Sequence, residues 1–211
     1  EIPPGPGAPQ VTASTVPPTR EARDTIYDNV QFPRVYIFHH SPAFGQPGFE
    51  AADVLSSVLS DGKSSRLYRK LVYEDRIAQD VSAQVWPTED CGLSFVVATA
   101  RPGVGAETLE SAILETLDDV RAGAITRREA EGGVNRATRE LVGAFDGVGS
   151  RSDAIATAAT FLGRPEYVNE LFPRVQAVTA ETIVQVANEW LVPERRATLH
   201  VLPEKAAEAG G

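Results

Sequence analysis

The stretch FEAADVLSSVLSDGKSSRLYRKLVYEDRIAQDVS, residues Phe49–Ser82, decides the fold of this chain of 211 residues. Its first part predicts an amphipathic helix, because apolar residues recur at helical spacing: Val54, Leu55, Val58 and Leu59. A short turn around Gly62 follows, and a second helix is predicted from Ser64 to Val72. The stretch therefore predicts a helix, a glycine turn, a helix and the start of a strand.

The strand that begins at Ile77 belongs to a predicted β-hairpin. Apolar residues alternate with period two in Ile77–Trp86 and again in Gly92–Arg101. Pro87–Asp90 supplies the turn between them. The pattern predicts two antiparallel strands with one buried face.

Three further strands complete the predicted sheet or lie at its margins. Arg23–Val30 and Val35–His40 have strand-like composition, and Pro33, which lacks an N–H donor, predicts a turn between them. The last predicted strand is Ala197–Leu202.

The region after the hairpin is predicted to be helical. An apolar stripe runs from Leu109 to Val120 and is ended by Gly123. Thr126–Glu129 is a capping box, and Gly147–Ser150 is predicted to be a loop that breaks the helices. Later helices are expected over residues 152–162, over residues 167–177, and from the N-cap Thr179 to a stop at Pro193. Strands followed by mostly grouped helices predict an α+β fold, an antiparallel sheet with helices packed on one face.

Composition divides the chain into three parts. Residues 1–19 form a proline-rich linker, since residues 1–18 hold six of the 15 prolines. Residues 20–203 are expected to form a single α+β domain, and residues 204–211 a flexible tail. The chain begins at Glu1 and contains no methionine, so we expect a processed protein or a fragment whose targeting segment lies upstream.

Charge and hydropathy exclude two classes of partner. The net charge is -9, with 20 Lys and Arg scattered among 29 acidic residues, which argues against nucleic-acid binding. No stretch approaches the roughly 18 consecutive apolar residues of a membrane span. The single cysteine, Cys91, leaves the redox compartment open.

Candidate metal ligands are few and badly placed. The chain has no H-x-x-E-H motif, and adjacent His39 and His40 point to opposite faces of a strand. His200 lies far away, in the last predicted strand. We therefore expect no metal site and no catalytic residue in this chain.

Two other motifs have a structural and a functional interpretation. Gly62-Lys63-Ser64 looks like the end of a phosphate-binding loop, but Ser57 stands where that loop needs glycine. We interpret it as a tight turn whose Ser64 caps the next helix. Cys91 is expected to be packed rather than reactive, and an independent enzymatic site at Ser64 or Cys91 is the weakest hypothesis.

Arg66 is the residue that we single out for a structural role. Arg66, Arg69 and Lys70 share one flank of the second predicted helix, and Glu74 is placed for an i, i+4 pair with Lys70. We favour a role in which Arg66 holds the helix against a neighbouring carboxylate, over contact with a partner domain or substrate.

The order of these pieces resembles a known family. Ser65-Arg66-Leu67-Tyr68 in its helix, the hairpin, and the ending through His200–Pro203 resemble the second, C-terminal half of pitrilysin/insulinase-like zinc metalloproteases. These are inverted zincins that include the mitochondrial-processing-peptidase-like proteins. Ser65, Arg66, Leu67 and Tyr68 are the structural motif of the resemblance.

The resemblance implies a role beside a catalytic partner. In this family a homologous first half binds zinc through two His and a distal Glu, and a further Glu activates water. The second half, which carries no zinc, would form the wall and lid of a chamber for unfolded peptides. The implied partners are a zinc-bearing homologous domain, on the same polypeptide or a second subunit, and a peptide substrate.

Two residues of this chain depart from the family positions that contact the substrate carbonyl. Many members place an Arg and a Tyr, seven residues apart, against the substrate carbonyl, and these substrate-facing positions fall at Val72 and Gln79. Valine cannot donate a hydrogen bond, and an amide is a weaker donor to an oxyanion than a phenol. The alternative is a catalytically inactive structural or assembly subunit of the same family. Exported bacterial relatives favour the periplasm mildly, although the sequence leaves the compartment open.

Overall fold

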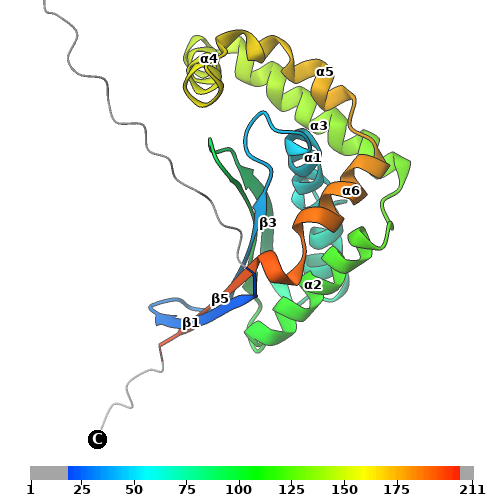
Figure 1. Ribbon diagram of the computed structural model, residues 1–211. Coiled ribbons are helices and arrows are strands. Elements are labelled where there is room, and N and C mark those ends of the chain that lie inside the picture. The colour runs from blue at the N-terminus through cyan, green and yellow to red at the C-terminus, as the bar shows by residue number, and fades with distance from the viewer. Residues whose placement is uncertain (1–18, 205–211) are drawn as a thin grey trace, which may run out of the picture.

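The computed structural model describes residues 19–204. They form one five-stranded sheet with strand order β1-β5-β2-β4-β3 (Figure 1). The linker and tail predicted at the two ends lie outside the described residues, apart from Thr19 and Glu204. The strands are β1 (Ala22–Asp28), β2 (Arg34–Ser41), β3 (Ala78–Trp86), β4 (Gly92–Ala100) and β5 (Arg196–Pro203).

The sheet is mostly antiparallel, which confirms the predicted α+β class. β3 and β4 form the expected hairpin, and β2 pairs antiparallel with both β4 and β5. A bend before Pro33 separates β1 from β2, but the two strands do not pair: β1 pairs in parallel with β5, from Ala22 opposite Ala197 to Asp28 opposite Pro203. Since β4 and β5 occupy both edges of β2, β1 cannot pair with β2 and lies at the outer edge of β5 instead.

Most of the helices lie on one face of the sheet, and the helix Val148–Leu162 lies beyond the end of the β3–β4 hairpin instead (Figure 1). Capping boxes at Thr126 and Thr179 begin two of them, as the sequence predicted. Short 3₁₀ turns at Pro165–Asn169 and Pro193–Arg195 connect the later elements. The α-helices are α1 (Phe49–Ser60), α2 (Ala106–Arg121), α3 (Arg127–Asp146), α4 (Val148–Leu162), α5 (Leu171–Gln176) and α6 (Ala180–Trp190).

Two predicted boundaries among these helices are wrong. The loop expected over 147–150 is reduced to Gly147, and α4 begins at Val148. The single helix expected over 167–177 is divided, since the first 3₁₀ turn ends at Asn169 and α5 starts at Leu171. Pro173 has no N–H donor and fits only in the first turn of a helix, so a helix that contains it must begin just before it.

The core lies between the sheet and the helices. Leu67 and Ile183, two predicted core positions, have no exposed surface, and Val35 and Ile37 of β2 are equally buried. α1 and α3 pack closely at Gly133, where an added Cβ would lie 2.9 Å from the side chains of Val54 and Val58. A side chain at this position would push the two helices apart.

The second helix of the opening stretch is a π-helix, Tyr68–Glu74. Its wide turn ends with the Asp75 N–H donating to the Lys70 carbonyl, five residues back. The expected pair between Lys70 and Glu74 is therefore wrong. Ion pairs join residues five apart instead: Arg69 with Glu74 at 3.5 Å and Lys70 with Asp75 at 3.3 Å.

Candidate functional site

The two substrate-facing positions lie at one corner of the sheet. Val72 is half-buried against the core, and its carbonyl accepts a hydrogen bond from Arg101 Nη2 at 3.3 Å. Gln79 sits at the bulge of β3, and its Nε2 donates to the Ala100 carbonyl at 2.7 Å. Arg101 Nε also donates to the Ala78 carbonyl at 3.0 Å, so Arg101 links Val72 to Ala78, the residue before Gln79. Substrate contact at Val72 and Gln79 stays a prediction, and the contacts observed there are made within the chain.

The Ser65–Tyr68 motif joins the π-helix to α3. Arg66 forms a bidentate ion pair with Glu129, in which Nε donates to Oε1 at 2.7 Å and Nη2 donates to Oε2 at 2.8 Å. Partial burial opposes ionisation of Glu129, but hydrogen bonds from Arg66 and Thr126 outweigh it and lower the pKa of this carboxyl to about 2. The side-chain hydrogen bond of the preceding turn belongs to Ser65, whose Oγ donates to the Gly62 carbonyl at 2.7 Å. Ser64 makes no cap to the helix, so that detail of the prediction is wrong.

The histidines occupy structural positions. His39 is buried under the helices, and burial, followed by the charge of Arg196, lowers its pKa to about 3. His40 lies on the opposite face of β2. His200 Nε2 lies 2.8 Å from Glu110 Oε2, and the same buried carboxylate binds Arg23 of β1 with 2.7 and 2.5 Å contacts. The ion pair between Glu110 and Arg23 thereby links the outer strand β1 to α2.

The candidate residues form neither a metal-binding site nor a reactive nucleophile. Within residues 19–204, no group of three or more His, Cys, Asp or Glu side chains is placed to hold a metal ion, so the zinc of the resembled family does not fit here. Burial raises the pKa of the Cys91 thiol, and its Sγ donates to the Gly92 carbonyl at 3.3 Å. A thiol held protonated in this way is a poor nucleophile.

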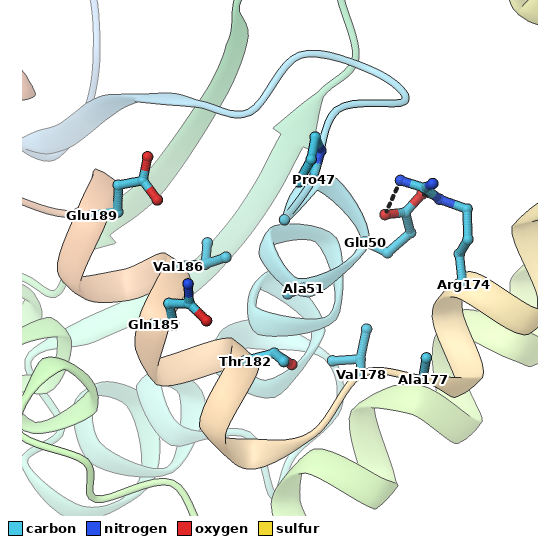
Figure 2. Close-up of a pocket in the computed structure, with 11 residues that line it drawn as sticks. Pro47, Glu50, Ala51, Arg174, Ala177, Val178, Thr182, Gln185, Val186 and Glu189 are labelled. Carbon is cyan, nitrogen blue, oxygen red and sulfur yellow. Dashed lines mark hydrogen bonds and ion pairs between the residues drawn. The ribbon is translucent and has the colours of Figure 1, made fainter.

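The groove of Figure 2 lies between the start of α1, α5 and α6 and has a volume of about 280 Å³. Its floor contains the buried carboxylate of Glu50, which accepts from Arg174 Nε at 2.6 Å and from the Tyr167 hydroxyl at 3.0 Å. Arg174 also lies over the Tyr167 ring, 5.3 Å from its centroid. These contacts satisfy Glu50 and join α1 to α5, so we assign this groove a structural role.

The helix-free face of the sheet carries a row of aromatic rings, which we call the aromatic face: Tyr36, Phe38, Phe95 and Trp86. The ring centroids of successive members are 6.2, 6.0 and 5.7 Å apart, across β2, β4 and β3. Trp86 is 60% exposed, and α1, α2, α3 and α6 lie on the opposite side of the sheet (Figure 1). Tyr36, Phe38 and Phe95 are partly buried, so the four rings form a partly exposed apolar patch, a feature typical of interaction surfaces.

Sequence reasoning missed this surface, although β2 contained a signal for it. Val35–Phe38 is apolar at every position, whereas a strand with one solvated face alternates apolar and polar residues. A central strand that is apolar on both sides is typical of a sheet whose two faces are both covered by other parts of a protein. The described helices cover one of them.

Fold and site together define an α+β domain that has a structural core, an apolar outer face and no metal-binding group within the described residues. The chain matches the family described as Peptidase M16 inactive domain over residues 1–136, and it belongs to that family. The resemblance to the second half of the pitrilysin/insulinase-like metalloproteases is thereby confirmed. In M16 proteins this inactive domain pairs with a homologous zinc-bearing domain.

The relatives of the chain are longer than the chain itself. It is 26% identical over 182 residues to the zinc protease PqqE of Helicobacter pylori, which covers 83% of this chain and 39% of that protein. The crystal structure of a protease from Helicobacter pylori matches with a TM-score of 0.82 at 20% identity, over 89% of this chain and 46% of the other. The periplasmic protease PqqL from Escherichia coli matches with a TM-score of 0.68 at 18% identity, over 88% and 21%. The two structures share the fold, and this chain spans less than half the length of each relative.

Proposed function

We propose that this chain is the zinc-free C-terminal domain of a metalloendopeptidase, and that it forms one wall of a peptide chamber opposite a homologous zinc-bearing domain. The aromatic face carries the proposal. Its rings are packed against one another as in an interior, yet Trp86 is mostly exposed. Burying such apolar surface stabilises association by roughly 25 cal/mol per Å².

Zinc, in this proposal, belongs to the partner. The family assignment supports a division of labour in which the zinc-bearing domain activates water and this domain closes the chamber. A peptide would lie along the zinc-bearing side as an added strand, with Val72 and Gln79 nearest to it on this side. Because Val72 has no side-chain donor and the amide of Gln79 is a weaker donor than a phenol, this domain would help to enclose the peptide rather than stabilise the oxyanion.

The proposed compartment is the periplasm. The support is the likeness to the periplasmic protease PqqL. Separately from this proposal, none of the helices within residues 19–204 has the length and hydropathy needed to cross a bilayer.

The test compares this chain alone with this chain mixed with the zinc-bearing domain. Zinc content is measured by atomic absorption, and casein hydrolysis by release of labelled peptides. We expect no zinc and no hydrolysis from this chain alone, and hydrolysis from the 1:1 mixture. Stoichiometric zinc, or hydrolysis by this chain alone, would overturn the proposal.

Point variants locate the contact between the two domains. Trp86→Ser should weaken association with the zinc-bearing domain at least tenfold in analytical ultracentrifugation, because it removes an exposed ring from the aromatic face. Tyr73→Ser is the matched control, since Tyr73 is 74% exposed but lies on the π-helix, outside that face. Equal losses in both variants would argue against the aromatic face as the contact.

The second candidate function is a catalytically inactive structural or assembly subunit. The lack of a side-chain donor at Val72, and an amide in place of a phenol at Gln79, favour it. The mixture distinguishes the two functions, since an assembled 1:1 complex that retains zinc but leaves casein intact would indicate the assembly role.

A further inference from the structure

A cavity of about 550 Å³ lies between the turn after α1 and the first turns of α3, away from the aromatic face. Four arginines line it, from the start of the π-helix segment and from α3: Arg66, Arg69, Arg128 and Arg136. Glu129 is the one acidic residue among the lining side chains. Four positive charges and one negative charge leave a net charge of +3 in a chain whose overall charge is -9.

Arg66 has a binding partner within the domain. It is held by Glu129 at 2.7 and 2.8 Å, and that carboxyl stays ionised because its pKa is about 2. This pair fixes one wall of the cavity and uses the only lining carboxylate. The charges of the other three arginines are therefore left without a carboxylate in the cavity itself.

Those three arginines have few partners elsewhere. Arg128 makes no hydrogen bond or ion pair with any residue in the range 19–204. Arg136 Nη2 donates to the Ser57 carbonyl at 3.3 Å, while its buried Nε has no partner among the same residues. Arg69 reaches Glu74 only at 3.5 Å, with both side chains more than half exposed, an arrangement that contributes little.

The backbone adds to the positive potential. α3 is 20 residues long and begins at Arg127, so the positive end of its dipole and its first N–H groups lie beside the cavity. Arg128 is the second residue of that helix, and Arg136 follows two turns later. The close α1–α3 contact at Gly133 keeps Arg136 beside the end of α1.

We propose that this cavity is a binding site for a small, multiply charged oxyanion of the phosphate type. A single carboxylate would compensate one arginine and leave two, whereas a phosphate group presents several charged oxygens to more than one guanidinium. The volume admits a group larger than inorganic phosphate. The proposal is independent of the pairing with a zinc-bearing domain, since every residue in it belongs to this chain.

Isothermal titration calorimetry at low ionic strength tests the site with inorganic pyrophosphate, inorganic phosphate and acetate as probes. We expect saturable 1:1 binding of pyrophosphate, weaker binding of phosphate and no binding of acetate at matched ionic strength. Raising the salt to about 0.5 M should weaken the pyrophosphate signal. Absence of saturable pyrophosphate binding would overturn the proposal.

Arginine variants distinguish binding at this cavity from a general attraction of anions to positive charge on the chain. Arg128→Gln and Arg136→Gln should each weaken pyrophosphate binding at least tenfold. Arg127→Gln is the matched control: it removes the same charge one residue away, from a side chain that is 91% exposed and paired with Glu131 at 2.7 Å. We expect less than a twofold change for this control.

Two results would contradict the assignment. Equal losses for Arg127→Gln and Arg128→Gln would show that the chain attracts anions without a site. A glutamate-rich peptide that bound more tightly than pyrophosphate, and was equally sensitive to Arg128→Gln, would replace the phosphate-type ligand with an acidic segment. Arg128 is exposed, so its variant remains a valid test even if Arg136→Gln reduces folding, which circular dichroism would report.

Discussion

Alternate residues of strand β2 lie in two different environments. Val35 and Ile37 point under the helices and have no exposed surface, whereas Tyr36 and Phe38 point to the helix-free side. The rings of Tyr36 and Phe38 are nearly parallel, with an interplanar angle of 11°. The same eight-residue strand therefore supplies both the core of the domain and the aromatic face that we propose as a contact surface.

The chemistry of the two faces differs in a consistent way. On β4 the helix-covered side carries Val96, Ala98 and Ala100, whose small size lets helices pack close to the sheet. The other side carries Phe95, in contact with Phe38 and Trp86. Small aliphatic residues build the permanent core, and large rings, which dominate interface energetics, cover the face left open.

The largest expected change in the free energy of unfolding comes from substitutions on the helix-covered face of the sheet. Ile37→Ala should lower the free energy of unfolding by about 2–5 kcal/mol, because it leaves a cavity among fully buried neighbours. Leu67→Ala and Ile183→Ala should fall in the same range, since both side chains are equally buried. Urea unfolding followed by circular dichroism gives the values. A loss below about 1 kcal/mol for Ile37→Ala would mean that the covered face is not closely packed.

A second test concerns Asp53, an acidic residue of α1, the helix that packs on the covered face of the sheet. Burial, with smaller contributions from Glu140, Asp61 and Glu50, raises the pKa of Asp53 to about 6. The folded state thus prefers the protonated acid, and stability is lost as pH rises through about 6. Asp53→Asn should therefore add about 2 kcal/mol at pH 8 and nothing below pH 4.

Urea unfolding at pH 4 and pH 8 measures the Asp53 effect. Asp153→Asn is the control, because Asp153 is exposed on α4 and its substitution should leave both values nearly unchanged. A gain at pH 4 equal to that at pH 8 would show that the effect is not electrostatic.

The third test addresses the open face directly. Phe38→Ala should cost the isolated chain only about 1 kcal/mol, although it removes a larger side chain than Ile37→Ala, because the ring is only partly buried against its aromatic neighbours. Urea unfolding is again the measurement. If Phe38→Ala costs as much as Ile37→Ala, the open face supports the fold of the domain by itself, and the contrast between the two faces fails.

The smallest expected effect lies outside both faces, at the turn from the π-helix into β3. Arg76 has a φ of 54°, a left-handed conformation that costs a residue with a Cβ more than it costs glycine. Arg76→Gly should raise the free energy of unfolding by about 0.5–1 kcal/mol. Arg69→Gly, inside the π-helix, should instead lower it by about 1 kcal/mol. A loss for Arg76→Gly would indicate that the arginine side chain contributes more than the backbone strain.

Local features of the fold could be predicted from sequence, and their errors are instructive. The strands of the hairpin and the helix α6 are close to their expected bounds, because side-chain period and capping are properties of neighbouring residues. The position of β1 could not be predicted, since its partner β5 is 175 residues away along the chain. The π-helix also escaped prediction, and with it the pairing of Arg69 and Lys70 with residues five positions on.

The candidate sites show the same limit. The sequence places Val72 and Gln79 seven residues apart, but it does not reveal that Arg101 joins Val72 to Ala78, the residue before Gln79. The cavity of arginines exists only because α3 packs against α1, which brings Arg128 and Arg136 to the same place as Arg66 and Arg69. Contacts between distant segments leave no periodic signal in the sequence.

The sequence by itself determined the class of fold, the expected absence of a zinc motif and the resemblance to a peptidase half, because these depend on residue types and on spacing along the chain. Only the tertiary structure decided which face of the sheet the helices cover and where β1 lies. It also decided which charges meet at the cavity. Alternation along a strand separates two faces, but packing between distant elements determines which face is buried.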